Sequence, residues 1–321
     1  MWDVACFGEL FIDLVPQAKV NGQWLLGPSP GGAPGNVAVG LARLGHKSLM
    51  MSRVGDEAFG KLILAALKSY GVDTSGVTLS STEKTGLSVV TLGEDGDRTF
   101  MFYHDRPADL HINPDDITAE RVGQSGILHI GLLPLSAPQS GAAQKKAMDL
   151  ADAANVTISC DVNFRPGLWA DHSKMLDAGR FIISRAAIVK VSEEELLALG
   201  AKAGMDELVQ SLWHDKLQFF SVTRGAEGAV LYTPDKKYVC DGFKVDAIDT
   251  TGAGDAYTAS ILSGVLEGGR LREPAQLVLN ACAAGALAAT KKGAMESLPQ
   301  ASDISKLIAE QTVTVSVHPR N

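Results

Sequence analysis

The chain has 321 residues, of which 45% are hydrophobic, and it carries 29 Lys and Arg against 37 Asp and Glu, a net charge of −8. This composition can fill a large core and is not that of a disordered chain. The acidic balance argues against a non-specific nucleic-acid binder, which needs a basic surface.

Neither a membrane segment nor a disulfide framework is expected. The longest small and apolar run, 277–289, is interrupted by Asn280 and is shorter than a helix that crosses a bilayer. Asp3 and Glu9 stand where a signal peptide would carry positive charge. The four cysteines are scattered without a Cys-x-x-Cys pair, which favours a reduced, cytoplasmic protein.

Apolar runs and helical periodicity alternate along the chain. Residues 4–8 form the first apolar run, and helical periodicity follows over 33–44 and 59–70. Later apolar runs predict strands at 126–130, 156–160, 187–190 and 219–223. Unbroken apolar strands divided by helices predict an α/β fold, with a doubly wound, mostly parallel sheet flanked by helices on both faces. We expect a single domain over residues 1–321.

Two stretches interrupt this rhythm and predict a small β lid. Residues 14–30 and 85–111 contain short β-like pieces and turns, with no room for a helix between 86–92 and 99–103. We expect these pieces to form antiparallel hairpins in one small sheet beside the main domain. Such a flap can exclude water from a site during group transfer. The alternative is a hairpin extension without a function.

The motif Asp249-Thr250-Thr251-Gly252-Ala253-Gly254-Asp255 precedes a predicted helix over 258–266. Glycines at a helix start leave backbone N–H groups uncovered, and the helix dipole adds about half a positive charge there, so the turn suits an anion such as phosphate. Asp255 could take a proton from a hydroxyl that attacks phosphorus. A helix cap is the alternative role, but it does not explain two glycines and two threonines beside the carboxylate.

A second Gly-rich cluster, Gly31-Gly32-Ala33-Pro34-Gly35-Asn36, opens the predicted helix over 33–44. The glycines would let a ligand touch the main chain, and Asn36 offers both a donor and an acceptor in the first turn. An ordinary Gly/Pro loop with an Asn near a helix start is the alternative.

These two motifs resemble the two signatures of the PfkB-type, ribokinase-like sugar kinases. The likeness covers the whole chain, from Phe7-Gly8-Glu9 to residues 292–299, and residues 8–14 and 161–166 are most similar to fructokinases. The resemblance implies a ribokinase-like fold, a small-molecule sugar and ATP with Mg²⁺ as the ligands, and K⁺ as a further cation. Independently of the resemblance, the exposed strands of the lid could pair edge to edge in a homodimer.

The resemblance assigns roles to residues around the sugar. Asp255 would be the catalytic base, and Gly252, Ala253 and Gly254 would form the anion hole. Arg165 would reach the sugar or the transferred phosphoryl group, where its planar fork binds oxygens well; a surface salt bridge is the alternative. The residues implied to hold the sugar are Asp13, Gly31, Gly32, Asn36, Tyr103, Arg106, Asn163, Arg165 and Asp255.

The resemblance also assigns roles around the nucleotide. Asp249 and Thr251 match positions that bind a monovalent cation. Glu195 matches the acidic end of an Asn-x-x-Glu element that helps to order magnesium, although Ser192 replaces the Asn; a solvated acidic helix start is the alternative. The residues implied to contact the nucleotide are Lys190, Glu195, Thr223, Gly225, Gly228, Gly252, Gly254 and Asn280.

The lid is where the chain departs from the family. Related fructokinases tend to have Phe-Tyr-Arg where this chain has Phe102-Tyr103-His104, and Arg106 is the nearest replacement for the missing cation. Fructose, phosphorylated to fructose 6-phosphate, is the expected substrate. The alternatives are 2-keto-3-deoxygluconate, another ketose or ribose-like sugar, and, in a different class, a catalytically silent sugar- or nucleoside-sensing module. The first strand and helix lack the Gly-x-Gly-x-x-Gly of a dinucleotide-binding oxidoreductase.

Overall fold

The structure is a computed structural model that describes residues 1–92, 98–103, 105–200, 204–268 and 273–320. Within these ranges, ten strands form the main sheet in the order β14-β13-β12-β11-β10-β9-β8-β1-β4-β5. The strands are β1 (Trp2–Phe7), β4 (Ser48–Gly55), β5 (Asp73–Ser80), β8 (Ser125–Ile130), β9 (Thr157–Asp161), β10 (Ile188–Ser192), β11 (Phe219–Thr223), β12 (Ala229–Tyr232), β13 (Lys236–Cys240) and β14 (Val315–Pro319).

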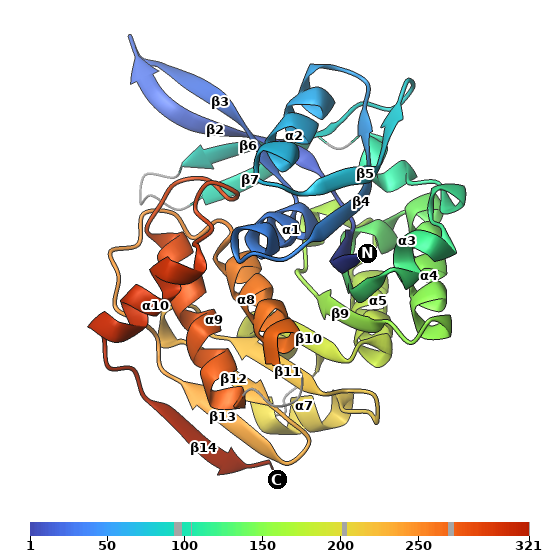
Figure 1. Cartoon of the computed structure of the whole chain (residues 1–321). Helices are drawn as coiled ribbons and strands as arrows, with labels where there is room; N and C mark the ends of the chain where they lie inside the picture. Colours follow the sequence, from blue (N-terminus) through green and yellow to red (C-terminus); the bar gives the residue numbers. More distant parts are fainter. Residues whose placement is uncertain (93–97, 104, 201–203, 269–272, 321) are drawn as a thin grey trace.

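The main sheet is parallel from β5 to β11, as the apolar runs predicted. The three strands beyond β11 pair antiparallel. The chain therefore ends on β14, at the lower edge of the sheet in Figure 1. Short connections join β11 to β12 and β12 to β13, as hairpins allow. Strand β14 joins the edge only after α8, α9 and α10.

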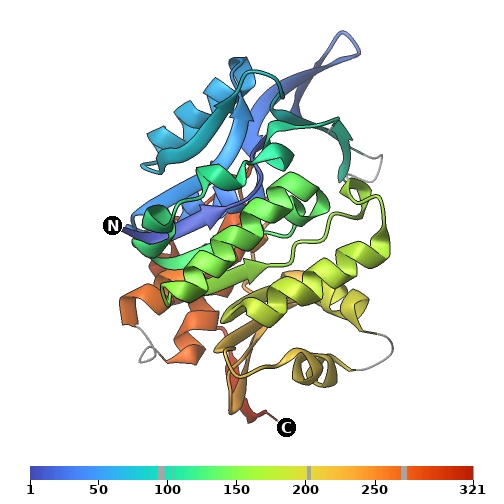
Figure 2. The ribbon, with the colours of Figure 1, turned by 90° about the vertical axis from the view of Figure 1, so that its right-hand side faces the viewer.

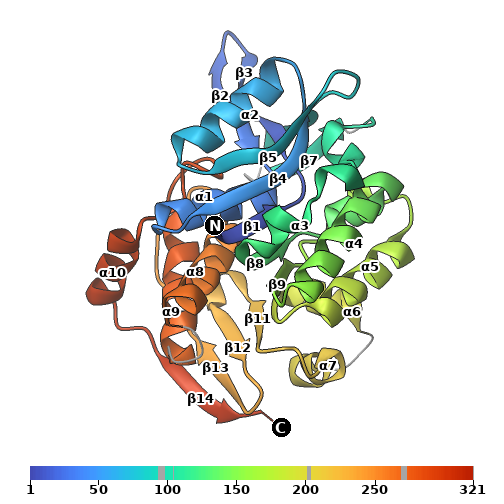
Figure 3. The same ribbon diagram turned by 45° about the vertical axis from the view of Figure 1, so that its right-hand side comes forward.

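Helices cover both faces of the main sheet (Figure 3). Alternate residues of β1 supply the two cores: Val4 and Cys6 pack into one, Ala5 and Phe7 into the other. The first core includes α1 (Ala33–Arg43), α2 (Ala58–Ser69), α8 (Ala253–Gly268), α9 (Pro274–Ala289) and α10 (Ala301–Glu310). The second core includes α3 (Ala119–Gly123), α4 (Pro138–Ala153), α5 (His172–Arg185), α6 (Glu193–Leu199) and α7 (Met205–Leu212). Figure 2 looks onto this second face, where the green α4 and the yellow-green α5 lie across the sheet. The predicted doubly wound α/β architecture is confirmed.

A close approach of two helices places the candidate site. A Cβ atom on Gly40 of α1 would lie 2.7 Å from the Cβ of Ala259 on α8, closer than real carbon atoms come. Only glycine permits this contact without a shift of one helix. The N-terminal turns of α1 and α8, which carry the two Gly-rich motifs, therefore lie side by side.

The lid is a second sheet with the order β3-β2-β6-β7. It consists of β2 (Phe11–Val20), β3 (Gln23–Gly31), β6 (Gly86–Leu92) and β7 (Arg98–Tyr103). The predicted antiparallel hairpins in one small sheet are confirmed. A parallel pair of β2 and β6 joins the two hairpins, and the chain passes through α1, β4, α2 and β5 between them. The tip of β2 and β3 projects from the body (Figure 1).

None of the helices in the described ranges is long and apolar enough to span a membrane.

Candidate active site

A cavity of about 550 Å³ opens where the first turns of α1 and α8 meet the carboxyl ends of the parallel strands. This is the edge at which open α/β sheets bind their ligands. The lid contributes Phe11 and Phe102, whose rings meet edge to face with centroids 6.4 Å apart. The other lining residues are Asp13, Gly32, Ala33, Asn36, Asp161, Asn163, Arg165, Lys190, Ala247, Ile248, Asp249, Thr250, Thr251, Gly252, Gly254 and Asp255.

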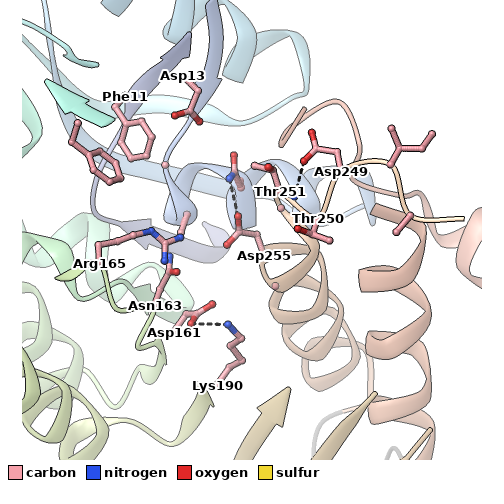
Figure 4. A pocket seen from close by; sticks show the side chains of 18 residues that line it. Phe11, Asp13, Asp161, Asn163, Arg165, Lys190, Asp249, Thr250, Thr251 and Asp255 are labelled. Carbon is pink, nitrogen blue, oxygen red and sulfur yellow. Dashed lines mark hydrogen bonds and ion pairs between the residues drawn. The ribbon is translucent and has the colours of Figure 1, made fainter. Parts of the chain in front are cut away.

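Asp255 and Asn36 form the centre of this cavity (Figure 4). The Asn36 amide donates a 2.7 Å hydrogen bond from Nδ2 to Asp255 Oδ2, and both side chains are less than one-tenth exposed. Burial raises the pKa of Asp255 to about 6, and the charge of Asp161 adds to the rise, against the Asn36 hydrogen bond and the charges of Lys190 and Arg165. The carboxylate is therefore ionised at neutral pH, but it is more basic than an ordinary aspartate and better suited to accept a proton.

The turn before α8 has the geometry of an anion site. Gly252 has a φ of 82°, and its missing side chain leaves room for Ala294, whose carbonyl oxygen would lie 3.1 Å from a Cβ. Gly254 faces Lys190, whose Nζ would lie 3.2 Å from a Cβ at that position. The first-turn amides of a helix lack intrahelical acceptors, so an ammonium group and uncovered N–H groups face the same part of the cavity.

The glycines at the start of α1 leave room for the Asp13 carboxylate. Gly32 has a φ of 110°, and a Cβ there would lie 2.3 Å from the carbonyl oxygen of Glu9, so no other residue fits. A Cβ on Gly31 would lie 2.8 Å from Asp13 Oδ2, and the Ser88 hydroxyl donates a hydrogen bond to Asp13 Oδ1. The glycines thus allow the Asp13 carboxylate, which comes from the lid strand β2, to enter the cavity beside the main chain.

Asn163 and Arg165 follow β9 and also line the cavity. Asn163 has a φ of 42°, a left-handed conformation that Asn tolerates better than most residues. Arg165 is exposed, and its Nη1 donates to the Phe164 carbonyl at 3.0 Å. In Figure 4 the guanidinium of Arg165 points inward beneath Phe11.

A second cavity of about 540 Å³ adjoins the first, because Ala247, Thr250 and Gly254 line both. The structure brings three predicted nucleotide residues to it: Thr223, Gly225 and Gly228. Its other walls are mostly apolar and come from Ala226, Gly242, Phe243, Lys244, Val245, Ala253, Tyr257, Cys282, Gly285, Ala286 and Ala289. A flat apolar slot with a few polar edges suits an aromatic base.

Four predicted site residues lie elsewhere. Tyr103 and Arg106 are exposed, and neither is among the described residues that line the first cavity. Asn280 accepts a 2.7 Å hydrogen bond from Gln276 within α9 and is not among the described residues that line the second cavity. Both oxygens of the Glu195 carboxylate accept backbone hydrogen bonds, from Phe164 at 2.9 Å and from Ser192 at 2.7 Å, so Glu195 caps α6 and fastens the loop after β9.

Asp249 organises the loop between the two cavities. Its Oδ1 accepts a hydrogen bond from the Thr251 amide and its Oδ2 one from the Gly293 amide, each at 3.0 Å. Asp249 is 3% exposed. A buried carboxylate in a loop of backbone carbonyls is a donor set that fits a hard cation such as K⁺.

Sequence reasoning missed Asp161 and the aromatic pair of Phe11 and Phe102. Asp161 is the last residue of β9, and its Oδ1 lies 3.1 Å from Lys190 Nζ. The available signal was its place at the carboxyl end of a buried parallel strand, the same signal that marks Asn163 and Arg165.

Residues 1–301 match the family model described as pfkB family carbohydrate kinase. The chain belongs to this family. It is therefore a sugar kinase, with the fold that the two Gly-rich motifs predicted.

Relatives within the family are fructokinases. The chain is 36% identical to a probable fructokinase-4 of Arabidopsis thaliana over 318 residues, which cover 95% of this chain and 96% of the relative. A crystal structure of a fructokinase from Xylella fastidiosa with bound ATP superposes with a TM-score of 0.87 at 30% identity, covering 97% and 99% of the two chains. A Vibrio cholerae O395 fructokinase with fructose, ADP and calcium bound superposes with a TM-score of 0.86 at 31% identity, covering 95% and 98%.

Proposed function

We propose that this kinase transfers the γ-phosphate of ATP to the terminal hydroxyl of fructose and so produces fructose 6-phosphate. The observation that carries the proposal is the buried Asp255–Asn36 pair at a glycine turn where two cavities meet. The similarity to fructokinases supports fructose as the substrate, because it extends over 95% of the chain.

The proposed reaction is an in-line displacement. The terminal hydroxyl oxygen of the sugar forms a bond to the γ-phosphorus while the bond from phosphorus to the bridging oxygen of ADP breaks. Asp255 takes the hydroxyl proton, and the backbone amides of Gly252, Ala253 and Gly254 stabilise the charge on the transferred group. Asp255 suits this role because its pKa of about 6 leaves it ionised but basic at neutral pH.

The sugar is proposed to occupy the first cavity. Asp13 from the lid and Asn36 from α1 are buried polar groups that can pair neighbouring hydroxyls, and Gly31 and Gly32 let the sugar approach the main chain. Asn163 and Arg165 close the opposite side, where the guanidinium can bind sugar or phosphoryl oxygens. Tyr103 and Arg106 would reach the sugar only if the lid moved toward the cavity.

ATP is proposed to occupy the second cavity, with its base near Thr223, Gly225 and Gly228 and its phosphates toward Gly254 and Lys190. In the described residues no three His, Cys, Asp or Glu side chains gather to hold a metal, so Mg²⁺ would be held mainly by the phosphates, whose charge it neutralises when bound. Glu195 fits only an indirect role toward it. Asp249 and Thr251 are proposed to hold K⁺, the ion that fits their oxygen donors.

The lid is proposed to belong to a single domain of residues 1–321 and to mediate a homodimer. Its outer strands expose Val20, Trp24, Leu25 and Leu26, a group of apolar side chains of the kind that mark protein interfaces. All four cysteines are free and buried, which fits a reducing compartment, and we propose the cytoplasm.

A coupled ADP-release assay across fructose, glucose, mannose, ribose and 2-keto-3-deoxygluconate tests the function. We expect the highest kcat/KM with fructose. A clear preference for 2-keto-3-deoxygluconate would replace the fructose assignment. Sugar binding without ADP release on any sugar would indicate a sensing module instead.

A further inference from the structure

Asp161 ties together three elements beneath the cavity. It ends β9, is 2% exposed, and its Oδ1 accepts a hydrogen bond from Lys190 Nζ at 3.1 Å. Its Oδ2 accepts one from Thr258 Oγ1 at 3.4 Å. Lys190 stands opposite Asp161 on the next strand, and Thr258 lies on α8 three residues after Asp255. One carboxylate therefore links β9, β10 and the helix that carries the candidate base.

Lys190 is a buried cation that needs this partner. Its side chain is 9% exposed, and its Nζ lies against the backbone of Gly254, 3.2 Å from where a Cβ would stand. Burial lowers the pKa of the Lys190 ammonium, but the charges of Asp161 and Glu195 outweigh this effect and raise it above its ordinary value. His129 lies on β8, and burial together with the charge of Lys190 lowers its pKa to about 3, so the imidazole is neutral.

The other carboxylates near Lys190 have different partners. Asp255 accepts its hydrogen bond from Asn36, and both oxygens of Glu195 accept from backbone amides. Among the described residues, Asp161 is thus the carboxylate that holds the Lys190 ammonium by a direct hydrogen bond. A lysine stem has four rotatable bonds, so its charge has a defined place only where such a partner fixes it.

We propose that Asp161 is a positioning residue of the phosphoryl-transfer site, which fixes the Lys190 ammonium against the Gly254 turn and so determines where the transferred group is held. The proposal rests on the kinase function proposed above. It assigns to Asp161 a role in the reaction that needs no contact with either substrate.

The charge of Asp161 has a second consequence for Asp255. Five groups face that carboxylate from the surrounding elements: Asn36 on α1, Asp161 on β9, Arg165 after β9, Lys190 on β10 and the buried Glu9 after β1. Burial and Asp161 raise the pKa of Asp255, whereas Asn36, Lys190 and Arg165 lower it. Without the charge of Asp161, the pKa of Asp255 falls and the base becomes weaker.

The kinetic test is Asp161→Asn, measured as kcat and KM against pH. Misplacing the ammonium should lower kcat by about 100-fold with little change in the KM for the sugar. The acidic limb of kcat/KM, which reports the free enzyme, should move to lower pH than in the wild type, because the base titrates lower. Asp152→Asn is the matched control, since Asp152 pairs with Lys216 at 3.1 Å on the surface. An unchanged kcat and an unchanged acidic limb in Asp161→Asn would overturn the proposal.

Two further variants separate positioning from folding. Asp161→Glu keeps the charge but displaces it, so kcat should fall while the acidic limb stays near pH 6; wild-type kcat in this variant counts against the proposal. In a double-mutant cycle, Asp161→Asn combined with Lys190→Met should be little worse than Lys190→Met alone, because Asp161 acts through Lys190. Additive losses would contradict that route.

A chemical measurement without substrates distinguishes this inference from the proposed function. Acetylation of Lys190 by acetic anhydride at pH 8, followed by mass spectrometry, reports the neutral amine, which becomes about tenfold more abundant for each unit by which its pKa falls. Labelling should be faster in Asp161→Asn than in the wild type and the Asp152→Asn control, and an equal rate would show that Asp161 does not hold the ammonium. If labelling responds as expected but the wild type phosphorylates no sugar, the proposed function fails and the placement of Lys190 stands.

Discussion

The floor and the roof of the first cavity are built in opposite ways. The floor consists of Asn36, Asp161, Lys190 and Asp255, which are all less than one-tenth exposed and joined by hydrogen bonds between elements of the main fold. The roof comes from a separate sheet, and it contributes the buried carboxylate of Asp13, an aromatic pair and half-exposed apolar side chains.

This difference separates the demands of chemistry from those of recognition. A base and a cation must be held within a fraction of an ångström, which the packed junction of α1, α8 and the strand ends provides. A cover that excludes water needs only to close over the substrate. Changes to the floor should therefore reduce turnover, and changes to the roof should alter binding or assembly.

Asp255→Asn should give the largest loss and most directly tests the role of the floor. Removing the base while keeping the shape should lower kcat by roughly 10²–10⁴-fold, or about 3–5 kcal/mol in activation free energy, with sugar binding nearly unchanged. Calorimetric titration with fructose beside the coupled assay measures both quantities. The exposed Asp115→Asn is the control, and near-full turnover in Asp255→Asn would remove the base assignment.

Gly32→Ala should displace the floor residue Asn36 by shifting the backbone at the start of α1. The new Cβ would stand 2.3 Å from the carbonyl oxygen of Glu9 at a φ of 110°, so the start of α1 must shift and carry Asn36 with it. We expect a loss of about 1–3 kcal/mol in the free energy of unfolding and a loss of activity. Denaturant unfolding measures the first, with Gly167→Ala as control, because nothing lies within 4 Å of its Cβ position.

Glu9→Gln should stabilise the protein above pH 7. Burial, together with the charge of Asp109, raises the pKa of Glu9 to about 7, and its Oε2 has no hydrogen-bond partner in the described part of the chain. Because the folded pKa lies above the ordinary value of 4.5, ionisation of Glu9 costs the folded state free energy above pH 7, and that cost disappears as the pH falls toward 4.5. The variant should gain about 3 kcal/mol at pH 8 and almost none at pH 4.5. Melting curves at both pH values test the sign, and equal gains at both would contradict it.

The smallest effect on folding is expected in the roof. Trp24→Ser with Leu25→Ser should shift the proposed homodimer to a monomer while the free energy of unfolding of each chain changes by about 0.5 kcal/mol or less. Light scattering across protein concentration measures assembly, and the exposed Leu62→Ser on α2 is the control. A monomeric wild type would contradict the dimer itself.

The parts of the site that share a local motif could be predicted from sequence. Gly252, Gly254 and Asp255 lie within one turn, so the spacing alone placed amides and carboxylate together. The lid and its hairpins were predicted from two stretches without helical periodicity. The parallel pairing of β2 with β6 was not predicted, because it joins strands that are far apart in the sequence.

Long-range contacts account for what the sequence did not reveal. Asn36 and Asp255 are 219 residues apart, and their hydrogen bond depends on the packing of Gly40 against Ala259. Asp161 ends the strand β9, and that place was the one signal available; its role became visible only with its partner Lys190 on β10. Asn280 stands on a helix whose other residues line the second cavity, and the periodicity of α9 was too uniformly apolar to show which side would face it.

The shared wall between the two cavities has a practical consequence. Ala247, Thr250 and Gly254 border both, so the two pockets adjoin at the anion turn. One molecule that joins a ketose to adenosine through a short chain of phosphates could fill both pockets. Once one half of this molecule is bound, the other half is held near its own pocket at a high effective concentration. Such a bisubstrate inhibitor should therefore bind far more tightly than either half alone.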